Sequence, residues 1–348
     1  MRLSDFDFDL PEELVAQRPS GTRGDDRLML LGRADGAVSH LRMDDLPGLI
    51  SPGTLMVFNN SRVRRARCYG TRLPGGAGGA REFVFLSRTD SEGRVWRAMV
   101  RGARRVRAGD RFSFPDGSVG TVVAREEDEG SGFRTLRFGS RLDEGWFLRN
   151  GRIPLPPYIR REDDDTDSER YQTVYAEEVG SAACPTAGLH FTGDMLARLD
   201  GRGIERCFVT LHVGLGTFLP VRAENIEEHA MHEEVYTVPP DAARKINRAK
   251  DEGRPILAVG TTSARTLESA TGADGAVRSG PGATRIFIYP GYTFRTVDQL
   301  FTNFHTPEST LLMLVSAFAG RGRVLSAYRQ AVRERYRFFS YGDCMLIK

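Results

Sequence analysis

The sequence predicts an α/β protein in which a smaller all-β module interrupts a larger domain. From residue 185 onward, apolar strands alternate with amphipathic helices, which predicts a mainly parallel sheet or an irregular barrel. Between residues 62 and 150, apolar and polar residues alternate and glycine-rich turns interrupt them, a pattern typical of antiparallel strands. The length of 348 residues favours two domains over one.

The predicted elements follow one another along the chain. Residues 1–61 read as short strands and turns that end in the apolar strand 54–58. After the inserted module, the proline-rich connector 151–159 and the acidic run 161–170, which we expect to be a solvated loop, return the chain to the larger domain. The segments predicted there are strand 206–213, helix 239–253, strand 255–259, helix 263–270, strand 284–289, a helix with Thr306 as N-cap, Pro307 at its first position and Gly320 at its end, and a last helix over 323–336.

Arginine is concentrated in the inserted module. Residues 62–111 hold fourteen arginines and four acidic residues, whereas the whole chain has 49 basic and 46 acidic residues and a net charge of +3. Strand alternation would place many of these side chains on one face. Such a face suits a phosphate backbone, and the alternative is a solvated surface in an arginine-biased protein. We expect a nucleic acid as partner.

The cysteine and hydropathy patterns indicate the compartment. The four cysteines lie far apart with no C-x-x-C pair, which argues against a zinc ribbon or a disulfide framework and favours a reducing environment. The first residues carry no apolar signal segment, and the longest apolar run, 311–319, is too short to span a bilayer. We expect a cytoplasmic monomer with no membrane partner.

Three histidines stand beside small residues at the edges of predicted elements. His190 follows the Pro-Thr-Ala-Gly-Leu segment, His212 ends a predicted strand, and His305 precedes the proline-started helix. Ligand sites of parallel α/β folds collect at the carboxyl ends of strands. Each histidine alone is more often structural, but together they predict a shared cleft in which imidazoles transfer protons or donate hydrogen bonds.

Two other clusters have ligand-binding residue types. His229 and His232, with Glu228 and Glu233, are side chains that a divalent ion accepts, but the H-x-x-H spacing separates the rings and no third ligand is indicated. We therefore predict no metal site. The lone G-x-G at 214–216 is weak support for a nucleotide loop.

The segment after strand 255–259 predicts an anion site. Gly260 is followed by Thr261, Thr262 and Ser263 at a helix start, where free N–H groups and hydroxyls suit a phosphate or a carboxylate, and Arg265 is nearby. Ordinary N-capping is the alternative.

These motifs together resemble those of one family, the S-adenosylmethionine:tRNA ribosyltransferase-isomerases of queuosine biosynthesis. The resemblance extends over almost the whole chain and includes VFNNSRV, GRIPLPPYI, PTAGLHF, TLHVGLGTF, HAMHEE, AVGTTSARTLES and TNFHTPESTLLMLVSAFAG. It implies a large barrel-like α/β domain, residues 1–61 and 151–348, with an inserted smaller antiparallel β-barrel domain, residues 62–150. Arg64-Arg65 stand where an Ile-Pro pair is expected, so we expect an altered attachment of the insert.

The resemblance also implies a reaction. The ribosyl group of S-adenosylmethionine is transferred to, and isomerised on, 7-aminomethyl-7-deazaguanine at the wobble position of tRNA, giving epoxyqueuosine-tRNA, adenine and methionine. S-adenosylmethionine is then a co-substrate, and no tightly bound cofactor or metal is required. We expect His190, His212 and His305 to be catalytic. The residues expected to bind substrates are Asn59, Asn60, Arg62, Tyr171, Thr186, Gly188, Gly214, Gly216, Thr217, His229, His232, Glu233, Thr261, Thr262, Ser263 and Arg265.

Three alternatives remain open on the residues alone. The histidine and glutamate clusters are compatible with a metal-dependent hydrolase, and the G-x-G is compatible with an RNA methyltransferase. The arginine-rich module is compatible with a tRNA-binding protein without catalysis. Zinc content, labelled-methyl transfer and adenine release, respectively, discriminate these functions.

Overall fold

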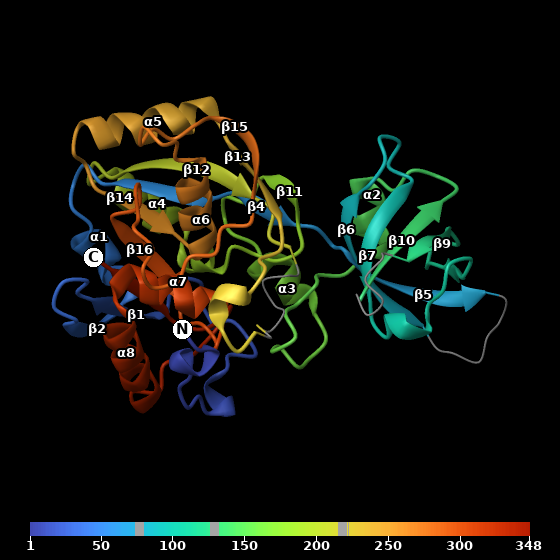
Figure 1. Cartoon of the computed structure of the whole chain (residues 1–348), viewed down its shortest axis with the longest axis horizontal. Coiled ribbons are helices and arrows are strands. Elements are labelled where there is room, and N and C mark those ends of the chain that lie inside the picture. Colours follow the sequence, from blue (N-terminus) through green and yellow to red (C-terminus); the bar gives the residue numbers. More distant parts are fainter. Residues whose placement is uncertain (74–79, 126–131, 215–220, 222) are drawn as a thin grey trace.

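The computed structural model describes residues 1–73, 80–125, 132–214, 221 and 223–348, and Figure 1 shows the whole chain. A large mixed α/β domain lies on one side and a smaller β-barrel on the other (Figure 1). The predicted fold class is confirmed.

The large domain is organised around one mixed sheet, nine-stranded among the described residues. Its central strands β12, β3, β14 and β16 pair in parallel, as the alternating pattern predicts. Antiparallel strands extend the sheet toward its edges, β15 and β2, although β17 and β1 pair in parallel. The order across the sheet is β15 (Gly280–Thr284), β13 (Glu234–Val238), β12 (Glu205–Leu211), β3 (Leu55–Asn59), β14 (Ile256–Val259), β16 (Gln299–Asn303), β17 (Cys344–Ile347), β1 (Arg27–Leu31) and β2 (Val38–Arg42).

Both faces of the central strands are buried. In β3, Leu55 and Val57 enter one hydrophobic cluster, and Met56 and Phe58 enter another, because successive side chains point to opposite faces. The first cluster includes apolar residues of α5, α6, α7 and α8, and the second includes those of α1 and α4. The helices of the large domain are α1 (Leu46–Leu49), α3 (Asp165–Arg170), α4 (Gly193–Asp200), α5 (Pro240–Asp251), α6 (Thr261–Ala270), α7 (Thr310–Ala319) and α8 (Arg321–Arg333), and η5 (Thr186–His190) is a 3₁₀ helix.

The inserted module is a closed antiparallel barrel. Its core is aromatic: Trp146 and Phe147 of α2 (Glu144–Asn150) pack edge-on against Phe85 of the barrel. The predicted boundaries, 62 and 150, stay predictions. The barrel strands, in closed order, are β10 (Phe133–Phe138), β7 (Val95–Val100), β6 (Arg81–Arg88), β5 (Arg67–Leu73), β8 (Arg111–Ser113) and β9 (Val119–Arg125).

The connection between the two parts contains a small parallel pair, β4 (Ser61–Val63) with β11 (Glu178–Ser181). Directly after β4, the Arg64 guanidinium donates to both carboxylate oxygens of Glu144, at 3.0 and 3.1 Å from Nε. It also lies over the ring of Trp96, 5.1 Å from the centroid. Arg64 thus attaches the connector to α2 and the barrel.

Three local predictions are wrong. Residues 285–289 form no strand; Ile286, Phe287 and Ile288 instead pack beside Leu311 and Leu314 of α7. Apolar side chains can be buried against a helix without forming a strand, and this run packs in that way.

The other two corrections concern caps and burial. Helix α7 begins three residues later than the Thr306 cap predicts, with the Ser309 hydroxyl accepting from the Leu312 N–H at 3.2 Å. The acidic run contains α3, and Asp167 within it is buried because Arg161 donates to both of its oxygens and Tyr341 donates at 2.7 Å. A bidentate arginine and a tyrosine offset the desolvation of this carboxylate.

No single described helix is long and apolar enough to cross a membrane; α7 and α8 pass such a test only as a pair, and they are bent by 116°.

Candidate active site

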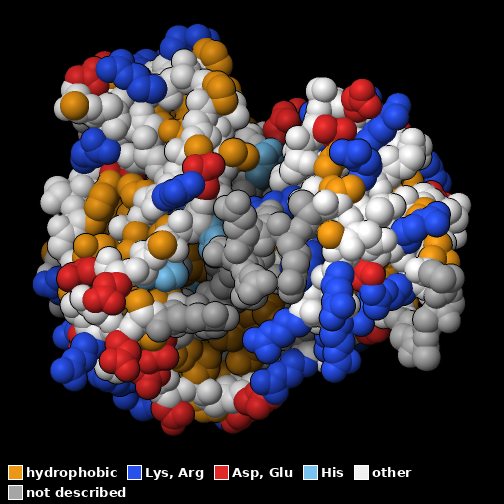
Figure 2. Space-filling model, turned by 45° about the vertical axis from the view of Figure 1, so that its right-hand side comes forward, with side chains coloured by type: hydrophobic (Ala, Val, Ile, Leu, Met, Phe, Trp, Pro, Cys, Tyr) orange, Lys and Arg blue, Asp and Glu red, His pale blue; other side chains and the backbone are white. Residues whose placement is uncertain are grey.

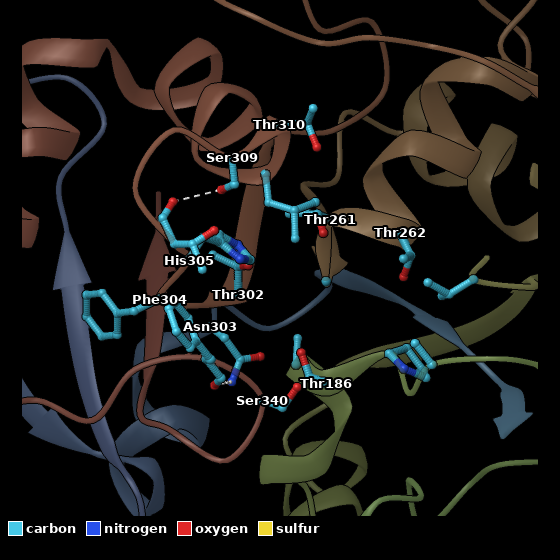
Figure 3. A pocket seen from close by; sticks show the side chains of 18 of the residues that line it. Thr186, Thr261, Thr262, Thr302, Asn303, Phe304, His305, Ser309, Thr310 and Ser340 are labelled. Carbon is cyan, nitrogen blue, oxygen red and sulfur yellow. Dashed lines mark hydrogen bonds between the residues drawn. The ribbon is translucent and has the colours of Figure 1, made fainter. Parts of the chain in front are cut away.

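A cavity of about 370 Å³ lies in the large domain. It opens where β14 and β16 end and where α6 and α7 begin, with η5 forming another wall (Figure 3). This is the carboxyl edge of parallel strands, the predicted location of a ligand site. The volume suits a small organic ligand.

The start of α6 supplies hydrogen-bond donors to this cavity. Gly260 has a φ of +91°, so the chain turns sharply from β14 into the helix. Thr261 and Thr262 line the cavity in the first turn, where backbone N–H groups have no partner within the helix. The Thr262 hydroxyl is held by Asn59, whose Nδ2 donates to it at 3.2 Å.

The start of α7 faces the same cavity. Ser309, Thr310 and Leu311 line it, and Figure 3 shows Ser309 and Thr310 on the side opposite Thr186 and Ser340. Two helix N-termini therefore converge on one space, which favours binding of an anionic group there.

His305 is the histidine that lines this cavity. Its Nε2 pairs with the Thr302 hydroxyl at 2.9 Å, and its backbone N–H donates to the Tyr328 hydroxyl at 3.2 Å. Burial lowers the pKa of His305 to about 3, so the ring is neutral near pH 7. A neutral imidazole at this position can donate or accept hydrogen bonds but is a weak base.

His190 lies behind the cavity wall rather than in it. Its Nδ1 pairs with Asp26 at 2.7 Å and its Nε2 pairs with the Asn303 amide nitrogen at 3.0 Å. Burial raises the pKa of Asp26, but the hydrogen bond with His190 and the contributions of Ser20 and Arg337 together lower it, and the net shift is downward. Asp26 is therefore an ionised acceptor. Both ring nitrogens of His190 are occupied, and Asn303 separates the ring from the cavity.

A second, larger cavity of about 1070 Å³ lies between the barrel and the edge of the large sheet. Figure 2 shows a hollow between the two parts and basic side chains gathered on the barrel beside it, all of them arginines because the barrel segment contains no lysine. We call this cavity the groove. Val213 lines both it and the 370 Å³ cavity, so the two spaces adjoin at this residue, just after the end of β12. The arginines that line it are Arg64, Arg88, Arg97, Arg141 and Arg285.

His212 lines the groove one residue before that junction. Burial and the nearby positive charge of Arg64 lower the pKa of His212, opposed by Glu178. Its Nδ1 is buried and has no hydrogen-bond partner among the described residues. The ring is therefore neutral near pH 7, and one of its nitrogens makes no hydrogen bond with the described part of the chain.

Comparisons with known proteins agree with this architecture over the whole chain. Residues 3–347 match the family described as Queuosine biosynthesis protein. The chain is 49% identical over 349 residues to the S-adenosylmethionine:tRNA ribosyltransferase-isomerase of Treponema denticola, covering 100% of both chains. It is 52% identical to the protein of that name from Symbiobacterium thermophilum, again over 100% of both.

A solved structure is also similar. The crystal structure of S-adenosylmethionine tRNA ribosyltransferase from Thermotoga maritima is 35% identical, with a TM-score of 0.56, over 99% of this chain and 100% of that one. The chain belongs to the S-adenosylmethionine:tRNA ribosyltransferase-isomerase family.

The structure of this ribosyltransferase-isomerase family member divides the predicted site residues among several places. Thr186, Thr261, Thr262 and His305 line the 370 Å³ cavity. His212, Gly214, His232 and Glu233 line the groove. The three histidines predicted to share one cleft are thus separated: His305 in the cavity, His212 in the groove and His190 behind Asn303.

Several predicted residues make contacts within the protein, and their predicted role in substrate binding stays a prediction. A Cβ on Gly188 would lie 2.0 Å from the Tyr175 hydroxyl, so the packing of this segment requires a glycine there. Tyr171 is fully buried against Tyr341, with ring centroids 5.8 Å apart. The Ser263 hydroxyl donates to the carbonyl of Val259 at 2.7 Å.

Two asparagines and an arginine predicted to bind substrate lie where β3 leads into β4, and they form hydrogen bonds with residues of the large domain. Asn59 donates to the carbonyl of Leu211 at 3.0 Å and accepts from its N–H at 3.0 Å, so it ties β3 to β12. Asn60 accepts from the Thr210 hydroxyl at 2.7 Å. Arg62 is exposed and reaches the carbonyl of Ala176 at 3.5 Å.

The remaining predictions concern the edge of the groove. His229 packs edge-on against Phe287, with ring centroids 5.5 Å apart, and Arg265 forms a buried ion pair with Glu234. Gly216 and Thr217 lie outside the described residues. No cluster of three or more metal-ligating side chains occurs in the described parts of the chain.

Three residues of the site were not predicted from the sequence. Asn303 stands in the same TNFH motif as His305, but an asparagine at a strand end reads as an ordinary turn residue. Asp26 and Glu234 lie in charged stretches that look solvated. Their burial depends on partners far away in sequence.

Proposed function

We propose that this chain transfers the ribosyl group of S-adenosylmethionine to 7-aminomethyl-7-deazaguanine at the wobble position of tRNA and isomerises it. The products are epoxyqueuosine-tRNA, adenine and methionine. The observation that carries the proposal is the match over residues 3–347, together with relatives at about half identity over their full length.

The 370 Å³ cavity is the proposed site for S-adenosylmethionine. Its two helix N-termini suit the methionyl carboxylate, and Thr261 and Thr262 supply hydroxyls at the first turn of α6. His305 is proposed to form a hydrogen bond with the nucleoside, since its lowered pKa of about 3 makes it a poor proton acceptor.

The groove is the proposed site for the tRNA. Its arginines suit phosphates. Because Val213 lines both the groove and the cavity, a wobble base held in the groove would approach S-adenosylmethionine near this residue.

The chemistry needs several proton transfers. The sulfonium acidifies the hydrogens at C5′, so a base can remove one, and the sugar then opens with loss of adenine. The aminomethyl group must lose a proton as it attacks, and adenine must gain one. His212, neutral and with an Nδ1 that has no partner among the described residues, lies next to Val213 and is the proposed proton acceptor. His190 is proposed to act through Asn303.

We also propose that the protein acts as a monomer in the cytoplasm. All four cysteines are unpaired and buried, as in a reducing compartment.

The test incubates the protein with S-adenosylmethionine and tRNA that carries the deazaguanine precursor. Mass analysis of the wobble nucleoside should show epoxyqueuosine, with stoichiometric adenine. Methyl transfer without adenine release, or tRNA binding without either product, would contradict the proposal.

A further inference from the structure

The side-chain amide of Asn303 has only one orientation that its surroundings permit. Its nitrogen lies 3.2 Å from the carbonyl oxygen of Phe339, which can only accept a hydrogen bond. The same nitrogen lies 3.0 Å from Nε2 of His190. Reversing the amide would bring its oxygen against the Phe339 carbonyl, two acceptors in contact. The network therefore assigns the nitrogen to this side.

This orientation determines the tautomer of His190. Nε2 must accept from Asn303, so the ring proton is on Nδ1, where it is donated to the Asp26 carboxylate at 2.7 Å. Asp26, His190 and Asn303 are all buried, and each donor in the chain faces an acceptor. The result is a rigid relay of hydrogen bonds from β1 to the end of β16.

The oxygen of Asn303 is left without a partner. Oδ1 is buried and accepts no hydrogen bond from any described residue, although Asn303 lines the 370 Å³ cavity. Figure 3 shows the Asn303 amide on the same side of the cavity as Thr186 and Ser340, below His305. A buried acceptor without a donor is unfavourable, and a ligand donor would remove that penalty.

We propose that Asn303 is a specificity-determining residue of the cavity, whose Oδ1 accepts a hydrogen bond from an N–H or O–H group of S-adenosylmethionine, and that His190 and Asp26 are positioning residues that hold this oxygen toward the ligand. This inference rests on the proposed function. The donor is the adenine amino group, a ribose hydroxyl or the methionyl ammonium group, all of which share the required chemistry.

The test compares affinities for S-adenosylmethionine and four analogues that each lack one donor: the 6-deaminated, 2′-deoxy, 3′-deoxy and desamino compounds. Calorimetry with the wild-type protein should show one analogue bound about tenfold or more weakly than S-adenosylmethionine, because Asn303 then keeps an unsatisfied oxygen. In Asn303→Ala, the ratio of the Kd of that analogue to the Kd of S-adenosylmethionine should fall to about twofold or less, as in a double-mutant cycle.

Thr186→Val is the comparison variant, because Thr186 lines the same cavity and carries a hydroxyl that can also accept a hydrogen bond from the ligand. It should keep the wild-type discrimination. Discrimination that survives in Asn303→Ala, or that disappears in Thr186→Val, overturns the proposal. If Asn303→Ala does not fold, the wild type decides: equal affinity for all five compounds overturns it.

The positioning role has its own readout. His190→Gln keeps a carbonyl acceptor for the Asn303 nitrogen, whereas His190→Ala removes it. Discrimination should persist in the first variant and decrease in the second; equal ratios in both contradict the positioning role. Failure of the proposed function looks different, since the wild type would then neither bind S-adenosylmethionine nor release adenine.

Discussion

The imidazole of His212 lies directly against the backbone of Gly180. A Cβ atom on that glycine would lie 2.9 Å from Cε1 and 3.0 Å from Nδ1 of the ring, and the glycine has a φ of +152°. The absence of a side chain on β11 thus determines where the ring of His212 lies, beside the junction of groove and cavity.

Gly180→Ala should displace this ring. We expect kcat for adenine release to fall by about 10- to 100-fold, because small misplacements of a reacting group are costly, while KM for S-adenosylmethionine changes little. Gly322→Ala is the control, since no atom lies within 4 Å of its added Cβ. An unchanged kcat in Gly180→Ala would argue against His212 as the proton acceptor.

His305 should make stability depend on pH. Its pKa is about 3 when folded and near 6.5 when unfolded, so between these values only the unfolded chain holds the extra proton. The free energy of unfolding should therefore fall as pH decreases from 6.5, by up to about 1.4 kcal/mol per unit from this group. Urea titrations at pH 4.5 and 7 measure how much the free energy of unfolding decreases between the two pH values. This decrease should be smaller for His305→Gln than for the wild type. His232→Gln, which removes an exposed imidazole, controls for the loss of any histidine. Equal decreases in wild type and His305→Gln refute the prediction.

Replacing only one residue of the Arg265–Glu234 ion pair should destabilise the protein. Both side chains are 5% exposed, and Glu234 also accepts from the Gly214 N–H at 3.2 Å. Glu234→Gln and Arg265→Met should each lower the free energy of unfolding by about 3–5 kcal/mol, because each leaves a buried charge without its opposite charge. Urea unfolding of the double variant should show a smaller loss than the sum. Simple additivity would mean that the two charges are not coupled.

Arginines of the groove should contribute to tRNA affinity. Arg88→Gln and Arg141→Gln each remove an exposed guanidinium from the groove lining. We expect weaker tRNA binding and a salt dependence reduced by about one unit of log–log slope per arginine, with unchanged affinity for S-adenosylmethionine. Arg329→Gln, an exposed arginine of α8, is the control. Filter binding at several salt concentrations measures both quantities, and equal slopes for groove and control variants contradict a groove-bound tRNA.

Much of the architecture follows from local sequence patterns. Alternation with a period of two in residues 62–150 predicts the antiparallel strands of the inserted module, and the strand at 54–58 lies within one residue of β3. His212 and His305 lie just after β12 and β16, as expected from their predicted positions at the ends of strands. Burial patterns of strands and helices are local, so a single sequence contains them.

The tertiary structure alone decided which polar groups meet. Asp26 and His190 are 164 positions apart, and His190 and Asn303 are 113 positions apart, yet they form one buried relay. No periodicity records such a contact, because it depends on β1, η5 and β16 being brought together by the sheet. The sequence determined that imidazoles stand at the ends of strands; only the packed fold decided that one of them faces the cavity, one faces the groove, and one orients an asparagine.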